Sequence, residues 1–417
     1  MSGFKKRHAV ILLALLAIFL VSRQLFEIRL VYLRLQRKDG LSRMSKSVTQ
    51  KEAIVTEKMT SELFVEAPTI IPKKLEHPIG YYFLTSSNDT LDEDHKSLIE
   101  NAPDFYNKRL PNIIMLGAKK CGTSAFREFL SAHRKIIVSR TNEPHFFDYF
   151  YDRGVNSYLE HFRNPIATDD LSKSLFEKSV NYIWEPIGSK FNNGSLVSVP
   201  EKILRTYKNY CGSKNCQDKL QLIVMLCDPS LRVYSDYVHD LSIEYPNEVI
   251  EDQQRAMESF GTFEDYVEKV TKLLDDDLEK NLYKKPFAAI TKGLYILQIK
   301  EWLNYFPLSQ FTIINGDEII QNPGKVMRQA QKDLGLDIQL TERGFIKIED
   351  SGHFCYRSDR FRCLDKRNKG RTRDATGSSK MSDKAKKILN HFYRRYNKEL
   401  FELFASNNLA VNFDWVR

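Results

Sequence analysis

Short apolar runs alternate with stretches of helical periodicity along the chain from about residue 111 onward. Three runs are almost wholly apolar, which predicts buried strands over residues 113–116, 220–226 and 311–314. Helical spacing of apolar residues predicts helices over residues 124–133, 229–237, 287–306, 324–334 and 384–403. Strands that alternate with helices predict an α/β fold in three layers, with a central, mostly parallel sheet flanked by helices. In such folds ligands bind beyond the carboxyl ends of the strands.

The N-terminus carries the pattern of a membrane signal. Lys5, Lys6 and Arg7 precede an apolar run over residues 9–21, which charged residues interrupt further on. A basic flank before an apolar run predicts an endoplasmic-reticulum signal with the N-terminus in the cytosol. No small-x-small cleavage site is clear, so we favour a type II signal anchor, with a cleaved signal peptide as the alternative. We expect a cytosolic tail, a transmembrane anchor, a luminal stem and a folded luminal domain, over residues 1–8, 9–29, 30–108 and 109–417.

Composition and charge limit the class of protein and of partner. Hydrophobic residues make up 42% and charged residues 28% of the chain, which excludes a wholly disordered protein. A net charge of +9 suits an anionic partner, whether nucleic acid, acidic lipid or acidic polysaccharide. A luminal address argues against nucleic acid. Asn88 and Asn193 stand in glycosylation sequons, which agree with that address.

A glycine-containing loop joins the first predicted strand to its helix. It consists of Gly117, Ala118, Lys119, Lys120, Cys121, Gly122 and Thr123. Glycines let backbone N–H groups face an anion, and the N-terminus of the helix adds partial positive charge. A Walker A loop would have lysine directly after its second glycine, where this chain has Thr123. The loop therefore predicts a P-loop-like phosphate site other than that of an ordinary nucleotide triphosphatase; the alternative is a plain strand–turn–helix junction with solvated lysines.

The loop resembles the 5′-phosphosulfate loop of sulfotransferases that use PAPS (3′-phosphoadenylyl sulfate). Five motifs in chain order resemble the heparan sulfate glucosamine 3-O-sulfotransferase family, at residues 142–148, 177–182, 226–237, 293–307 and 354–371. The second motif, EKSVNY, is closer still to the N-sulfotransferase domain of heparan enzymes. The resemblance covers about residues 110–417. It implies sulfate transfer from PAPS, without a metal, to a glycosaminoglycan at the Golgi membrane, most simply to the 3-OH of glucosamine in heparan sulfate.

The resemblance also implies roles for individual residues. Glu143 is the expected general base, with His145 and Asp148 orienting the base or the acceptor. Lys120 and Lys178 are expected to stabilise the transferring group and the leaving phosphate. The expected donor-binding residues are Lys119, Lys120, Cys121, Gly122, Thr123, Ser124, Cys227, Ser235, Lys369, Gly370 and Arg371. As residue types alone, Glu143 is more simply a surface glutamate, and only the resemblance reverses that interpretation. The alternatives are a structural histidine for His145 and solvated lysines for Lys120 and Lys178.

The chain departs from the family pattern at three positions. Cys227 takes the place of an arginine that would pair with the 3′-phosphate, and a hydrogen bond to a charged group contributes about 1.5–3 kcal/mol. Its loss predicts roughly tenfold or more weaker PAPS binding, although the N-sulfotransferase domain also lacks that arginine. Ser124 replaces an arginine near the acceptor, and Cys121 replaces a glycine. In the same family a basic acceptor-side residue falls at Lys292, and Arg232 would support the 3′-phosphate segment.

Six cysteines do not make a disulfide-dense scaffold. The resemblance implies a disulfide between Cys355 and Cys363. Cys211 and Cys216 are close enough for a second bridge; a zinc site is the alternative, but no second ligand pair accompanies them. Cys121 and Cys227 stand at strand ends and are predicted to be free.

Other functions remain open at this point. N-sulfation of heparan is favoured by EKSVNY, although the chain has no room for the deacetylase domain of those enzymes. Chondroitin sulfotransferases share a similar loop and a similar second strand. A catalytically weak polysaccharide-binding relative is a different class, supported by Cys227 and Ser124.

Overall fold

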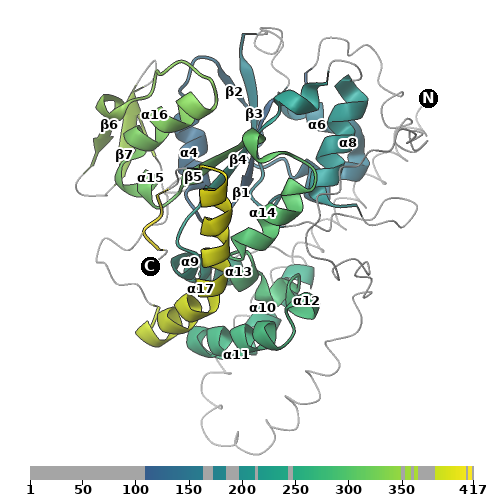
Figure 1. The fold of residues 1–417 in the computed structure, drawn as a ribbon, viewed down its shortest axis with the longest axis vertical. Helices are drawn as coiled ribbons and strands as arrows, with labels where there is room; N and C mark the ends of the chain where they lie inside the picture. Colours follow the sequence, from purple (N-terminus) through teal and green to yellow (C-terminus); the bar gives the residue numbers. More distant parts are fainter. Residues whose placement is uncertain are drawn as a thin grey trace, which may run out of the picture. The chain divides into compact units, whose positions relative to one another are not determined.

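A five-stranded parallel sheet forms the centre of the part of the chain that the structure describes (Figure 1). The strand order is β2-β3-β1-β4-β5, and every neighbouring pair is parallel. The strands are β1 (Ile113–Gly117), β2 (Ile136–Val138), β3 (Ser174–Lys178), β4 (Gln221–Leu226) and β5 (Phe311–Asn315). The connection after β1 leads to β2 on one side, and the connection after β4 leads to β5 on the other. The crevice between the ends of β1 and β4 is therefore the switch point at which ligands bind in such sheets.

The computed structural model describes residues 109–162, 172–184, 197–211, 215–242, 248–348, 353–357, 361–364, 381–409 and 412–415. The predicted tail, anchor and stem, both sequons at Asn88 and Asn193, and the residues Lys369, Gly370 and Arg371 all lie outside these ranges. Within them, no helix is both long and apolar enough to span a bilayer.

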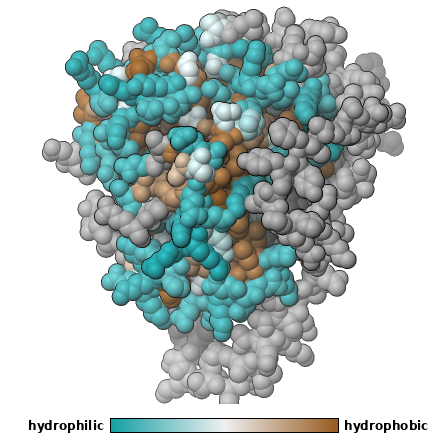
Figure 2. Space-filling view, viewed as in Figure 1, coloured by the Kyte–Doolittle hydropathy of each residue, from teal (hydrophilic) through white to brown (hydrophobic). Residues whose placement is uncertain are grey.

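Helices pack around the sheet, as the alternating pattern predicts (Figure 1). They are α4 (Thr123–Leu130), α5 (Phe146–Tyr149), α6 (Gly154–Leu159), α8 (Val199–Cys211), α9 (Pro229–Leu241), α10 (Glu248–Glu258), α11 (Phe263–Asp276), α12 (Leu278–Asn281), α13 (Ala288–Thr291), α14 (Tyr295–Leu303), α15 (Glu318–Gln321), α16 (Pro323–Asp333) and α17 (Asp383–Ser406). Short 3₁₀ turns cover Tyr151–Arg153, Glu160–Phe162, Cys216–Lys219, Lys285–Phe287, Leu308–Gln310 and Glu342–Gly344. The long helix α17 contacts α9, α11 and α14, so it packs against three helices from earlier in the chain. Hydrophilic side chains cover much of the face in Figure 2, with apolar ones gathered across its middle.

The predicted strands are confirmed where the sequence is an unbroken apolar run. All five residues of β1 and the last five of β4 are buried, as expected for central strands of a parallel sheet covered on both faces. The strands β2 and β3 were not predicted. β2 has only three residues, and β3 ends in Glu177 and Lys178, whose charges hide a strand that is buried at both positions.

The single helix predicted over residues 287–306 is wrong in its extent. The chain forms α13, then turns through Lys292, Gly293 and Leu294, and resumes as α14. At the turn Gly293 lies against α17: a Cβ there would come within 2.7 Å of the hydroxyl oxygen of Tyr393. That hydroxyl donates to the carbonyl oxygen of Ile290 at 2.6 Å. Tertiary packing therefore decides the break.

A second, antiparallel sheet holds the strands β6 (Phe345–Lys347), β7 (Phe354–Arg357) and β8 (Phe361–Cys363). Cys355 and Cys363 are direct partners in the β7–β8 register and form a disulfide, which confirms the implied pairing. Cys211 and Cys216 are also bonded, at the end of α8, which confirms the second bridge over the zinc alternative.

Candidate active site

Two glycines allow the loop between β1 and α4 to make its turns. The φ angle is 147° at Gly117 and 92° at Gly122. A Cβ at Gly117 would lie 2.6 Å from the carbonyl oxygen of Val180, and one at Gly122 would lie 2.9 Å from a side-chain carbon of Ile319. Only glycine suits both positions. The loop therefore turns sharply at the carboxyl end of β1 and leads directly into the N-terminus of α4.

The N-terminus of α4 has the character of an anion site. Gly122 is its N-cap residue, no hydrogen bond from a side chain caps it, and its first turn contains no acidic residue. The first N–H groups of a helix have no partner within the helix, and the macrodipole adds positive potential there. A phosphate or sulfonate group therefore fits this end, as the loop sequence predicts.

Lys119 of the loop is turned toward α9. Its ammonium nitrogen lies 2.8 Å from an oxygen of Asp236 and 2.5 Å from one of Asp240. Burial would lower the pKa of Lys119, but the two carboxylates outweigh burial and raise it. The structure thus places Lys119 as a brace between the loop and α9. Asp236, His239 and Asp240 lie close enough together for a metal ion, but Lys119 already pairs with both carboxylates.

Lys178, at the end of β3, joins two predicted parts of the site. Its ammonium nitrogen lies 2.7 Å from Oε1 of Glu143 and donates to Oγ of Ser124, in the first turn of α4, at 3.3 Å. The other carboxylate oxygen of Glu143 accepts from the backbone N–H of Val180 at 3.3 Å. A single side chain, that of Lys178, therefore joins the expected base Glu143 to the first turn of α4, although the three residues are far apart in the sequence.

His145 and Asp148 continue this cluster. Nε2 of His145 lies 3.4 Å from Glu143, and Nδ1 lies 2.8 Å from Asp148, whose side chain is fully buried. His145 has a positive φ of 52° and precedes the short helix α5. Together Glu143, His145 and Asp148 form a carboxylate–imidazole–carboxylate chain. The structure brings together four of the five expected catalytic residues; the fifth, Lys120, stands on the neighbouring loop.

The electrostatics of the cluster favour an ionised Glu143 and a protonated His145. Burial would raise the pKa of Glu143, but the hydrogen bond to His145 and the charge of Lys178 lower it to about 2. Burial would lower the pKa of His145, but its hydrogen bonds to Asp148 and Glu143 raise it to about 10. Burial lowers the pKa of Lys178 despite its carboxylate partner. Near neutral pH Glu143 is ionised and His145 is protonated.

We expect Asp148→Asn to lower the pKa of His145, because it removes the strongest interaction that raises it. The stabilisation that depends on charged His145 is complete below the unfolded pKa of about 6.5 and is lost as pH rises through the folded value. In the parent protein the stabilisation should fall progressively above pH 6.5 and be gone above about pH 10, and in the variant it should be smaller and be gone at a lower pH. Denaturant unfolding between pH 6 and 10 measures it; coincident profiles would contradict the assignment.

Sequence reasoning missed the residues that support His145. Oγ of Ser179 accepts from the backbone N–H of His145 at 3.0 Å and donates to Oε1 of Glu177 at 2.8 Å. Glu177 is fully buried and also accepts from the hydroxyl of Tyr158. Burial raises the pKa of Glu177 to about 7. The segment EKSVNY was a signal for both residues, but only the fold showed that it braces the histidine.

The segment after β4 is held by its own carboxylate. Oδ1 of Asp228 accepts from the backbone N–H groups of Ser230 and Leu231, at 2.8 and 3.3 Å, and so caps α9. Arg232 is fully buried, pairs with Asp236 at 2.7 Å and donates to the carbonyl oxygen of Ala289. Arg232 therefore supports the segment from inside. Ser235 lies on the same helix and is half-buried.

Lys292 has an internal position. It is buried, its ammonium nitrogen lies 5.0 Å from the ring centroid of Trp184, and it is 3.9 Å from Asp236. Burial, together with repulsion from Lys119, lowers the pKa of Lys292 to about 8. The acceptor-side role that the resemblance implies for this lysine finds no support in this position.

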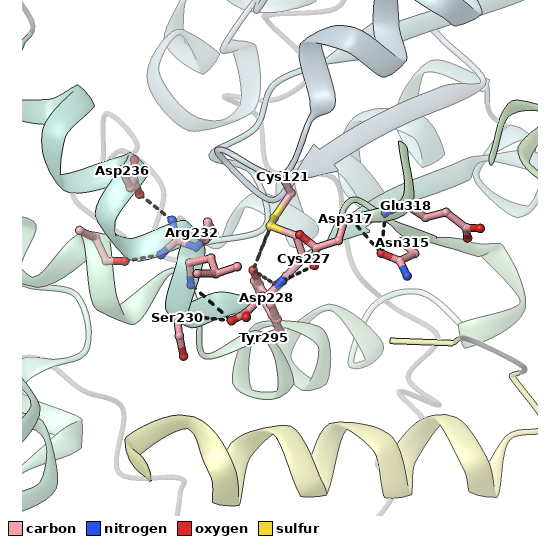
Figure 3. The surroundings of a disulfide bond; sticks show 12 residues. Cys121, Cys227, Asp228, Ser230, Arg232, Asp236, Tyr295, Asn315, Asp317 and Glu318 are labelled. Carbon is pink, nitrogen blue, oxygen red and sulfur yellow. Dashed lines mark hydrogen bonds and ion pairs between the residues drawn. A yellow bond between two sulfur atoms is a disulfide. The ribbon is translucent and has the colours of Figure 1, made fainter. Parts of the chain in front are cut away.

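The prediction that Cys121 and Cys227 are free is wrong. They form a disulfide across 106 residues of sequence, with their Cα atoms 5.4 Å apart. The reason is the strand order: β1 and β4 are neighbours, so the residues beyond their carboxyl ends meet. Figure 3 shows the bond beside Tyr295, whose hydroxyl donates to the carbonyl oxygen of Cys227 at 3.0 Å and lies 3.5 Å from the sulfur of Cys121.

The comparisons with known proteins agree with this geometry. Residues 110–402 match the family described as sulfotransferase domain. Heparan sulfate glucosamine 3-O-sulfotransferase 3A1 of Homo sapiens is 27% identical over 304 residues, which cover 72% of this chain and 62% of the relative. Bifunctional heparan sulfate N-deacetylase/N-sulfotransferase 4 of Mus musculus is 30% identical over 304 residues, which cover 70% of this chain and 30% of the relative.

The chain thus spans less than two thirds of the length of these relatives. A solved sulfotransferase structure from Alicyclobacillus acidocaldarius aligns with 19% identity and a TM-score of 0.46, over 74% of this chain and 100% of that one. The family match itself covers well over half of the chain and includes the loop, the base cluster and the segment after β4. The chain belongs to the sulfotransferase domain family.

Proposed function

We propose that this chain transfers sulfate from PAPS to a glucosamine of heparan sulfate, most simply to its 3-OH. The observation that carries the proposal is Lys178, which bridges the carboxylate of Glu143 and the first turn of α4. This contact puts a base, a cation and an anion site next to one another, as sulfuryl transfer requires. The relatives named for heparan sulfate sulfation support the choice of acceptor.

In this mechanism the 5′-phosphosulfate of PAPS lies against the loop and the N-terminus of α4. Glu143 is ionised near neutral pH and accepts the proton of the acceptor hydroxyl as its oxygen forms a bond to sulfur. The bond from sulfur to the bridging phosphate oxygen breaks, and the product is 3′-phosphoadenosine 5′-phosphate, PAP. The loop amides, Lys120 and Lys178 stabilise the charge that develops on the leaving phosphate.

The donor site suits the two phosphate ends of PAPS. The 5′-phosphosulfate would bind at the uncapped N-terminus of α4, and the 3′-phosphate would bind along the segment from Cys227 to Ser235. Lys369 and Arg371, on either side of Gly370, would add cations for binding the donor. The Golgi membrane, a type II anchor, glycosylation at Asn88 and Asn193, and a luminal catalytic domain belong to the same proposal.

N-sulfation of heparan is the second candidate, and the EKSVNY motif that contains Ser179 favours it. This residue belongs to the EKSVNY form of the motif and holds the backbone of His145 directly. A hydroxyl and an amine acceptor would use the same base. The two reactions differ in which atom of glucosamine receives the label.

The test is sulfate transfer from labelled PAPS by the full chain in detergent. Heparan sulfate, N-desulfated heparan and chondroitin are offered separately, and the products are mapped as disaccharides. Label at O3 of glucosamine is the expected result. Label at nitrogen or on chondroitin alone would keep the donor and replace the acceptor. No label, together with no PAP binding at high micromolar concentration, would overturn the proposal.

A further inference from the structure

We propose that the Cys121–Cys227 disulfide is a positioning device for the donor. It fixes the phosphate loop to the end of β4 and compensates for the absence of an arginine at position 227. The inference rests on the proposed function, because donor binding is its readout. It assigns Cys121 and Cys227 a role other than direct contact with phosphate.

The bond stands where the donor is expected to bind. β1 and β4 are adjacent, and their connections leave in opposite directions, so the crevice between their ends is the switch point of the sheet. Cys121 belongs to the loop after β1, and Cys227 directly follows β4. The disulfide therefore links the expected 5′-phosphosulfate segment to the expected 3′-phosphate segment (Figure 3).

Both cysteines depart from the 3-O-sulfotransferase pattern, and one bond joins them. The resemblance places glycine at position 121 and arginine at position 227. Cys121 alone would leave a buried thiol in the loop, and Cys227 alone would only remove a cation. Paired, they exchange a charge contact for a covalent link, and the two substitutions become a single feature.

The disulfide has a rigid frame around it. Cys121 and Cys227 are almost completely buried. Gly316, after β5, packs so closely that a Cβ there would lie 2.3 Å from the carbonyl oxygen of Cys121. The backbone N–H of Ala118 donates to the carbonyl oxygen of Met225 in β4 at 2.8 Å, and Tyr295 of α14 braces Cys227. Close packing and backbone hydrogen bonds therefore hold the segments at both ends of the disulfide.

Lys120 lies between two anchors of the loop. Lys119 is tied to α9 through Asp236 and Asp240, and Cys121 is tied to β4 through the disulfide. Lys120 itself has a φ of 71°, a conformation that a lysine rarely adopts without support. The two anchors hold this backbone in place before the donor arrives. A preorganised loop loses less freedom on binding, which favours affinity.

The experiment compares two double variants of the full chain in detergent. Cys121→Ala/Cys227→Ala removes the proposed device. Cys211→Ala/Cys216→Ala is the matched control, since it removes a disulfide at the end of α8. The readouts are the Kd of PAP by calorimetry, KM for PAPS, KM for heparan sulfate and kcat. All are measured below the lowest Tm of the set, which circular dichroism provides.

We expect the first variant to raise the Kd of PAP and KM for PAPS about tenfold or more, because the loop must then be ordered by the donor. KM for heparan sulfate should stay within about twofold, and the control should bind PAP as the parent does. Equal or tighter PAP binding by the first variant would overturn the inference and leave the proposed function standing. Absence of PAP binding by the parent protein would overturn the proposed function itself.

A third variant keeps the inference open to test if the alanine pair does not fold. Cys121→Gly/Cys227→Arg restores the residues that the resemblance places there. If the disulfide compensates for the arginine, this variant should bind PAP within a few-fold of the parent without the bond. Folded protein that binds PAP at least tenfold more weakly than the parent would contradict the exchange that we infer.

Discussion

Replacing Glu143 with glutamine should lower kcat for sulfate transfer by about 10²–10⁴-fold, the usual contribution of a general base. Glutamine keeps the size of the side chain and can still contact Lys178 and His145, but it cannot accept the proton of the acceptor. The Kd of PAP should change little, since Glu143 does not belong to the loop. Initial rates with labelled PAPS and calorimetry with PAP measure the two quantities.

The matched control is Glu201→Gln, which changes a glutamate paired with Arg205 on α8. It should leave kcat within about twofold, as surface ion pairs contribute little. Transfer that persists in Glu143→Gln would show that another group takes the proton. A parent protein that binds heparan sulfate but never transfers, with unchanged affinity in the variant, would instead favour the polysaccharide-binding class.

Asp236→Asn should lower the free energy of unfolding by about 3–5 kcal/mol, as is typical when one partner of a buried ion pair is removed. The carboxylate is fully buried and lies 2.7 Å from Arg232 and 2.8 Å from Lys119, with Lys292 at 3.9 Å. Asparagine would leave three cations around a neutral group, with Asp240 as the remaining carboxylate on Lys119. Urea unfolding of the parent and the variant at pH 7 measures the difference.

The pH dependence of this stabilisation has a definite sign. Burial would raise the pKa of Asp236, but the charges of Lys119, Lys292 and Arg232 hold it far below its usual range. A carboxylate with a lowered folded pKa contributes stability above its unfolded pKa of about 3.9, and that contribution is lost only as pH falls toward the folded value. The contribution of the Asp236 carboxylate itself should therefore be constant above about pH 5, whereas Lys292, whose pKa Asp236 helps to raise, adds a dependence of its own near its pKa of about 8.

Asp275→Asn is the control for this prediction. Asp275 pairs with Arg395 at 2.6 Å, but both side chains are about half exposed. Exposed pairs contribute about 0–1 kcal/mol, so the variant should unfold almost as the parent does. Equal losses in the two variants would contradict the view that burial makes Asp236 essential.

The predicted anchor at residues 9–29 lies outside the described residues and stays a prediction. Its test is independent of the site: protease protection of the full chain in microsomes should leave residues 109–417 intact and expose only the short N-terminal tail.

The sequence by itself determined the elements whose signals are local. The apolar runs at β1, β4 and β5 predict buried strands because a strand covered on both faces needs nothing but apolar side chains. The anion site is also a local signal. Two glycines between a strand and a helix predict it because neighbouring residues set the backbone geometry of such a loop. The pairing of Cys211 with Cys216 could likewise be predicted from their short separation in the sequence.

Only the tertiary structure decided what depends on which strands are neighbours. It joined Cys121 to Cys227 across 106 residues, brought Lys178 of β3 to Glu143, and directed Lys119 toward Asp236. It also buried Glu177 and Lys178 in a strand that their charges concealed. Strand order and helix packing are properties of the whole core, since each charge is tolerated there only because another segment supplies its partner.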